Sequence, residues 1–133
     1  PIDIIILMLG TNDFKAQYQQ SPQDIANNMR KLIKFVRASN KGPQAAASKI
    51  VLIAPPPVAT LPGMNAQFDA RSVELSKLLG KVYQELAAQE SCLFLDAALY
   101  GVASKSDGLH FDHESHTRLG QAVASVLQRE FVG

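Results

Sequence analysis

The stretch PIDIIILMLGTND, residues 1–13, decides the fold. Residues 2–9 form a nearly continuous run of β-branched and long aliphatic side chains, which is typical of a strand covered on both faces. Gly10, Thr11, Asn12 and Asp13 follow at once, and residues of these types favour a turn. We therefore expect a central buried strand over Ile2–Leu9 that ends in a polar turn.

Two further strands are predicted downstream, at Lys49–Ala54 and Cys92–Asp96, where short apolar runs occur. Helical patterns separate the three strands and follow the last one. The order β-α-β-α-β-α predicts an α/β fold with a parallel sheet and helices on both faces. Ligands of such sheets bind beyond the carboxyl ends of the strands, so polar residues there are candidate site residues.

Three helices are predicted from apolar residues at helical spacing. The first follows Ser21, a natural N-cap with proline after it. The second covers roughly Gln67–Gln89 and is interrupted at Gly80, since glycine costs about 1 kcal/mol relative to alanine inside a helix. The third begins near His113, after the cap Asp112. The predicted inward-facing residues are Ile25, Met29, Leu32, Ile33 and Val36, then Val73, Leu75, Leu78, Leu79, Val82 and Leu86, and finally Leu119, Val123, Val126, Leu127 and Phe131.

Length and composition restrict the function classes. The 133 residues fit one domain, and 47% apolar residues can form a core. A net charge of +1 without a basic cluster argues against nucleic-acid binding, and the longest apolar run is too short to span a membrane. Cys92 is the single cysteine and is expected to pack as a small apolar residue; without a second cysteine, the cytoplasm is favoured over an oxidising compartment.

The start of the sequence is unusual, because Pro1 is followed within one residue by the predicted central strand. Neither an initiator methionine nor a signal peptide is visible, so the compartment stays open. We expect residues 1–133 to be the C-terminal part of a single domain in a longer polypeptide.

Two motifs fall at the carboxyl ends of predicted strands. In Asp107-Gly108-Leu109-His110, a tight turn would bring the carboxylate to the imidazole, which is the pairing that a catalytic histidine needs. The alternative is an ordinary Asp-Gly turn with a histidine beside it. Asn12 could donate its side-chain amide to an oxyanion, or it could cap backbone groups of its own turn.

Other residues allow further interpretations. His110, His113 and His116 recur at every third position and could bind zinc or iron, but His110 is expected to precede the helix. His113 and His116 are then exposed residues of the first turn, and no metal is predicted. Pro55-Pro56-Pro57 is a stiff strand exit that could form one wall of a substrate cleft together with residues 61–68.

Taken together, the motifs resemble those of the SGNH (GDSL-type) hydrolases, serine esterases and acyltransferases on a flavodoxin-like, three-layer α/β/α fold. Gly10-Thr11-Asn12-Asp13 is similar to the family's Gly-x-Asn-Asp block, and Asp107-Gly108-Leu109-His110 is similar to its Asp-x-x-His block. The surroundings, Leu7–Lys15 and Ala54–Pro57, resemble the arylesterase/acyltransferase branch in particular. The Gly-Asp-Ser block that carries the family's nucleophile is absent, and none of the ten serines has that context.

The resemblance implies a hydrolase of short acyl or aryl carboxylic esters. His110 would be the general base and acid, Asp107 its orienting carboxylate, and Asn12 the oxyanion donor, with Gly10, Thr11 and Pro56 contacting substrate. The serine would come from an upstream segment, which is thus the expected partner; no cofactor is implied, and a homo-oligomer is possible by the same resemblance. An inactive α/β interaction module and a histidine-ligated metal hydrolase are the alternatives.

Overall fold

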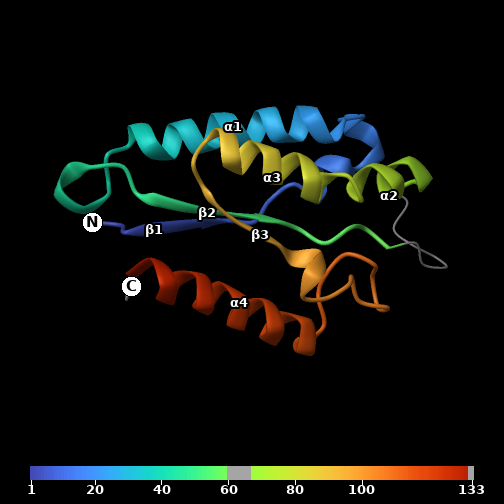
Figure 1. Ribbon diagram of the computed structural model, residues 1–133. Coiled ribbons are helices and arrows are strands. Elements are labelled where there is room, and N and C mark those ends of the chain that lie inside the picture. The colour runs from blue at the N-terminus through green and yellow to red at the C-terminus, as the bar shows by residue number, and fades with distance from the viewer. Residues whose placement is uncertain (60–66, 132–133) are drawn as a thin grey trace.

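The computed structural model describes residues 1–59 and 67–131 and shows a three-layer α/β arrangement (Figure 1). Strands β1 (Ile4–Leu7), β2 (Lys49–Ala54) and β3 (Leu93–Asp96) form one parallel sheet in the order β1-β2-β3. Among the described residues, four α-helices flank this sheet: α1 (Pro22–Ala38), α2 (Ala70–Ser76), α3 (Leu79–Gln89) and α4 (His113–Phe131). The predicted α/β fold with a parallel sheet is confirmed.

The sheet separates two apolar cores. Helices α1 and α3 cover one face and α4 covers the other, as Figure 1 shows. Successive residues of a strand point to opposite faces, so Leu52 of β2 packs on the α1–α3 side while Val51 packs on the α4 side. Both side chains are fully buried, which makes β2 the centre of the sheet. No helix among the described residues is long and apolar enough to span a membrane.

Helix α1 begins as its sequence predicts. The Ser21 hydroxyl accepts a hydrogen bond from the Asp24 backbone N–H, and the Asp24 carboxylate accepts one from the Ser21 N–H, which forms a capping box. Four of the five predicted inward-facing residues are buried, and Leu32 is partly buried: Ile25, Met29, Leu32, Ile33 and Val36.

The predicted second helix is two helices, and the break is not at Gly80. Helix α2 ends at Ser76 and α3 starts at Leu79, so Leu78 falls in the break and is 53% exposed instead of facing inward. Gly80 lies inside α3, where the helix approaches the end of β3. A Cβ at this position would lie 2.7 Å from the Asp96 carboxylate, so the close approach requires glycine. Tyr83 of α3, which periodicity did not select, is fully buried in the core on the α1–α3 side of the sheet.

Strand β1 is shorter and more exposed than predicted. It covers Ile4–Leu7 rather than Ile2–Leu9 and lies at an edge of the sheet, and the Ile6 residue is 43% exposed. The expectation that it is the central strand, covered on both faces, is wrong for the described chain. Ile6 pairs with Val51 and points to the face of the sheet that α4 covers. Among the described residues, α4 is the only α-helix on that face, and it leaves Ile6 exposed.

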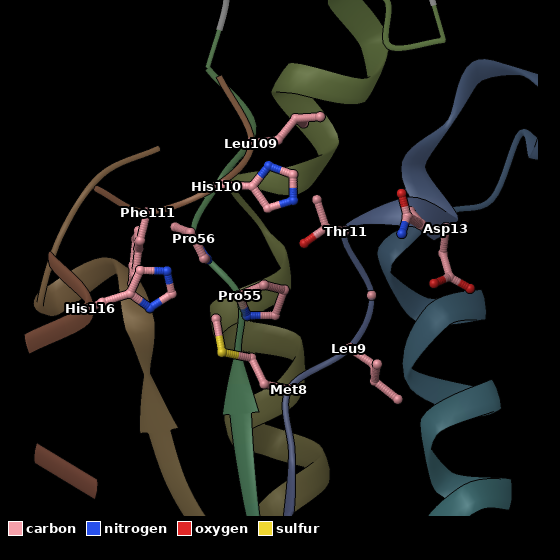
Figure 2. A pocket seen from close by; sticks show the side chains of 12 residues that line it. Met8, Leu9, Thr11, Asp13, Pro55, Pro56, Leu109, His110, Phe111 and His116 are labelled. Atoms are coloured by element: carbon pink, nitrogen blue, oxygen red, sulfur yellow. The ribbon is translucent and has the colours of Figure 1, made fainter. Parts of the chain in front are cut away.

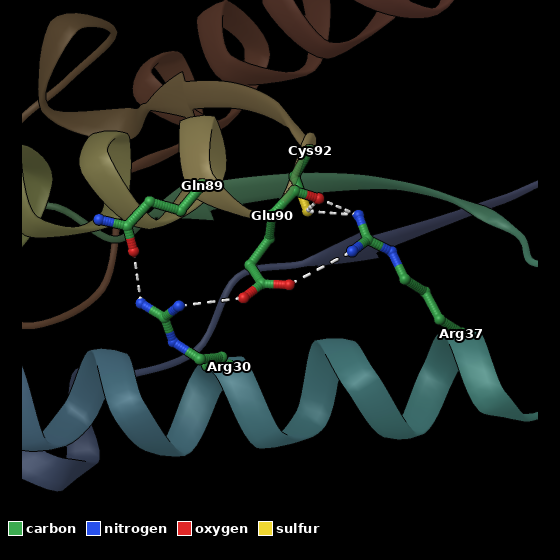
Figure 3. Close-up of polar contacts among 5 residues, drawn as sticks. All are labelled: Arg30, Arg37, Gln89, Glu90 and Cys92. Atoms are coloured by element: carbon green, nitrogen blue, oxygen red, sulfur yellow. Dashed lines mark hydrogen bonds and ion pairs between the residues drawn. The ribbon is translucent and has the colours of Figure 1, made fainter.

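A polar cluster fastens α1 to the turn before β3 (Figure 3). Arg30 and Arg37 each donate to one carboxylate oxygen of Glu90, at 3.1 and 3.3 Å. Arg37 also donates to the Glu90 carbonyl and lies 3.7 Å from the Cys92 sulfur. Partial burial raises the pKa of the Cys92 thiol, which packs against the core as predicted but also has polar neighbours. Cys92 therefore belongs to a structural contact at the edge of the sheet opposite the carboxyl ends of the strands.

Candidate active site

A cavity of about 400 Å³ lies at the carboxyl ends of the strands (Figure 2). Residues that follow β1 and β2 form part of its wall, and the loop before α4 together with the first turn of α4 forms the rest. The lining residues are Met8, Leu9, Gly10, Thr11, Asn12, Asp13, Pro55, Pro56, Leu109, His110, Phe111 and His116. The structure thus gathers the two sequence motifs around one cavity, as the parallel sheet requires.

The Asp107 carboxylate and the His110 imidazole are in direct contact. His110 Nδ1 lies 2.6 Å from Asp107 Oδ2. Asp107 Oδ1 accepts hydrogen bonds from the backbone N–H groups of Leu109 and His110, at 2.9 and 3.0 Å, and from the Ser104 hydroxyl at 3.1 Å. These contacts fix the position of the carboxylate before any ligand binds.

Hydrogen bonding also keeps the Asp107 carboxyl ionised and so makes it the acceptor of this contact. The His110 side chain, followed by the backbone N–H groups of His110 and Leu109, holds the pKa of the Asp107 carboxyl well below its usual range. An ionised carboxylate can only accept, so Nδ1 of His110 carries the proton and donates it. Nε2 of His110 has no hydrogen bond within the described residues and is left for a reacting group.

The loop that carries Asp107 is tied down on both sides. Gly108 has φ +70°, a conformation that suits glycine, and its carbonyl accepts from Ala59 N–H at 2.9 Å. Ser104 accepts from Gly108 N–H and donates its own N–H to the His110 carbonyl, at 2.9 and 2.7 Å. The bond to Ala59 links the acid–histidine loop to the chain leaving β2.

The turn after β1 depends on a close approach at Gly10. Gly10 has φ +127°, and a Cβ on it would lie 2.9 Å from the Tyr83 hydroxyl oxygen and 3.1 Å from a Leu79 methyl carbon. That hydroxyl donates to the Leu9 carbonyl at 3.0 Å, and burial together with the Asp13 carboxylate raises the pKa of Tyr83. Tyr83 of α3 therefore supports the strand exit from below.

The Asn12 side chain is exposed at the cavity and is not used by its own turn. The short helix Asn12–Phe14 is closed by backbone bonds, from Asp13 N–H to Gly10 O, from Phe14 N–H to Thr11 O, and from Lys15 N–H to Asn12 O, each 3.2 Å. Within residues 1–59 and 67–131, no hydrogen bond of the Asn12 amide is found. The alternative in which Asn12 caps its own turn is not what the structure shows.

Three residues at or beside the cavity were not singled out as site residues from the sequence. Phe111 is buried below the cavity, and the ring of His116 meets it edge-on, with centroids 5.8 Å apart. His116, predicted as an exposed first-turn residue after a metal-ligand role was considered, is exposed and lines the cavity, whereas His113 does not. Tyr83 could have been found from its spacing, since it lies four residues after Leu79 on the buried side of α3.

Other predicted features of the site fall in three groups. Gly10, Thr11 and Pro56 line the cavity, as does Pro55. Of the predicted cleft wall 61–68, residues 61–66 lie outside the described part of the chain. Among the residues that the structure describes, no serine lines the cavity, and no group of three or more His, Cys, Asp or Glu side chains could hold a metal ion.

The protein is an α/β protein with a parallel sheet. The cavity at the carboxyl ends of its strands brings together an acid–histidine pair and an exposed asparagine. The model of the GDSL-like lipase/acylhydrolase family matches residues 1–119, and the chain belongs to this family. None of the curated proteins compared with the chain matches it.

Solved structures agree with this assignment. Est24, a carbohydrate acetylesterase from Sinorhizobium meliloti, is 36% identical with a TM-score of 0.89, over 98% of this chain and 62% of its own. The native aryl esterase of M. smegmatis is 33% identical with a TM-score of 0.88, over 97% of this chain and 61% of its own. Axe2, an acetylxylan esterase from Geobacillus stearothermophilus, is 19% identical with a TM-score of 0.62, over 96% of this chain and 58% of its own, and shares the fold. The chain spans about 60% of the length of the structures it matches.

Proposed function

We propose that this chain is the C-terminal part of a carboxylic-ester hydrolase domain that reacts through an acyl-enzyme. The observation that carries the proposal is the 2.6 Å contact between His110 Nδ1 and Asp107 Oδ2 at the wall of the cavity that Asn12 also lines. Membership in the acylhydrolase family and the likeness to aryl and carbohydrate esterases support the same chemistry.

The chemistry divides among three side chains. His110 Nε2 takes the proton of a serine hydroxyl as that oxygen attacks the ester carbonyl, and Asp107 stabilises the resulting imidazolium. The Asn12 amide donates to the tetrahedral oxyanion, a contact worth roughly 10²–10³ in turnover. His110 then gives its proton to the leaving alcohol, and water or a second alcohol releases the acyl group by the same steps in reverse.

We further propose that the attacking serine lies on a segment outside residues 1–133. No serine lines the cavity among the described residues, and the His110 side chain is 80% exposed, which leaves space for another segment beside it. Strand β1 has one neighbour in the described sheet, and the apolar residues Ile2, Ile6, Met8 and Leu9 in and around it are exposed; Met8 and Leu9 also line the cavity. A segment that pairs with the open edge of β1 would lie beside these residues and could bring a serine to His110.

Labelling with a fluorophosphonate probe tests the activity. The native protein, including any polypeptide joined to or co-purifying with Pro1, is expected to take up the label and to hydrolyse phenyl acetate. His110→Ala should abolish both, whereas His113→Ala, an exposed histidine on the neighbouring turn that does not line the cavity, should leave both unchanged. A native protein that neither labels nor cleaves the ester would refute the proposal and favour an interaction module.

Two further outcomes test the details. The isolated 133-residue chain is expected to remain unlabelled, and labelling of this chain alone would refute an external serine. Chelator is expected to leave the ester hydrolysis unchanged, because catalysis is assigned to His110, Asp107 and Asn12. Loss of activity with chelator, restored by a metal ion, would favour the metal-hydrolase alternative instead.

A further inference from the structure

We infer that His116 binds the alcohol part of the ester and favours alcohols that carry hydroxyl groups. This inference rests on the proposed function and adds a specificity-determining residue to it. His116 of α4 lines the same cavity as His110, which lies in the loop before α4. The buried Phe111 follows His110 and packs against the His116 ring.

The reaction indicates which side of the cavity the alcohol part of the ester occupies. In the tetrahedral intermediate the oxyanion points to Asn12, while the leaving oxygen must lie within reach of His110 to receive its proton. In Figure 2, Thr11 and Asp13 of the oxyanion turn lie on one side of His110, and Phe111 and His116 lie on the other. We place the alcohol that leaves from His110 along the side formed by Phe111 and His116, away from the oxyanion turn.

The chemistry of that side is amphipathic. The Phe111 ring supplies an apolar surface, and the His116 ring stands on it edge-on at an interplanar angle of 82°. A neutral imidazole has one nitrogen that donates and one that accepts, so it can bond a hydroxyl in either sense. No hydrogen bond of the His116 ring occurs within the described residues, which leaves both nitrogens for a ligand. An alcohol with an apolar ring face and neighbouring hydroxyls, such as a sugar, satisfies both features.

Two acetate esters with different alcohols isolate this contact. A monoacetylated methyl hexoside and phenyl acetate give the same acetyl-enzyme, so deacylation is common to both and kcat/KM reports the step in which the alcohol is still present. In the native protein, His116→Ala is expected to lower kcat/KM for the hexoside roughly three- to tenfold, the worth of one hydrogen bond, and to change that for phenyl acetate by less than about twofold.

Matched variants separate binding from folding. His116→Gln keeps a donor and an acceptor and is expected to restore most of the hexoside activity, while His113→Ala should leave the ratio of the two substrates unchanged. An equal loss for both esters, or no loss for either, would refute the role of His116 while fluorophosphonate labelling of the wild type still supported the esterase. A wild type that takes no label would refute the proposed function, and this inference with it.

Discussion

Replacing Gly10 by alanine should destabilise the protein and displace Asn12. At φ +127°, an L-residue is strained by about 1–3 kcal/mol. The new Cβ would also lie 2.9 Å from the Tyr83 hydroxyl oxygen and 3.1 Å from a Leu79 methyl carbon, and overpacking of this kind costs about 1–3 kcal/mol. The sum, about 2–6 kcal/mol, is a large fraction of the stability of an ordinary domain.

Urea unfolding of the parent and the variant measures this loss, and a partner substitution identifies its source. Tyr83→Phe alone removes the hydrogen bond to the Leu9 carbonyl and should cost about 1 kcal/mol. Because it also removes the oxygen nearest to the new Cβ, Gly10→Ala with Tyr83→Phe should lose less than the sum of the two single changes, by about 1 kcal/mol. A Gly10→Ala variant within about 0.5 kcal/mol of the parent would refute the reasoning, and so would strict additivity of the pair.

Three further predictions concern helix packing, acid stability and the acid–histidine pair. Gly120→Ala should stabilise the protein by about 0.5–1 kcal/mol, since nothing lies within 4 Å of its Cβ position in α4, whereas Gly80→Ala should lose that gain against the Asp96 carboxylate; equal midpoints of urea unfolding for the two variants would contradict this. Hydrogen bonds lower the folded-state pKa of four carboxyls, those of Asp24, Asp69, Asp107 and Asp112. Their contribution to the free energy of unfolding should therefore be complete above the ordinary aspartate pKa of about 3.9 and be lost as the pH falls below it. A midpoint of urea unfolding that rises in acid would contradict the assignment. Asp107→Asn should lower kcat of the native protein by about 10⁴ with the fold intact by circular dichroism, and wild-type turnover in that variant would remove Asp107 from the mechanism.

Local chemistry made much of the fold predictable. The capping box at Ser21 and the β-branched residues of β2 act through neighbours in the sequence, so α1 and β2 were predicted closely. The cap at Asp112 is of the same kind, since its carboxylate accepts from Ser115 N–H three residues later. The Asp107–His110 contact also lies within one turn, which is why a four-residue motif could predict it.

Features that depend on distant contacts could not be predicted in this way. Position 80 requires glycine because the carboxylate of Asp96, which is distant in the sequence, lies against it. Helix propensity, which can be read from the sequence, does not explain this glycine. The exposure of Ile6 depends on how far α4 reaches across the sheet. His116 lines the cavity and its ring meets that of Phe111, and helical spacing alone cannot show that contact.

The two halves of the candidate site are held together by the sheet rather than by each other. Asn12 follows β1 and His110 precedes α4, and their common support is β2, which pairs with β1 and whose exit at Ala59 donates to Gly108. In the register of this pairing, Ile6 lies opposite Val51 and Leu7 opposite Leu52, which places the end of β1 beside the end of β2. The pairing of β1 with β2 and the Ala59–Gly108 bond therefore both contribute to the geometry between the oxyanion donor and the base. A proline at position 59 would remove that donor, and the change should move His110 relative to Asn12 before it unfolds the sheet.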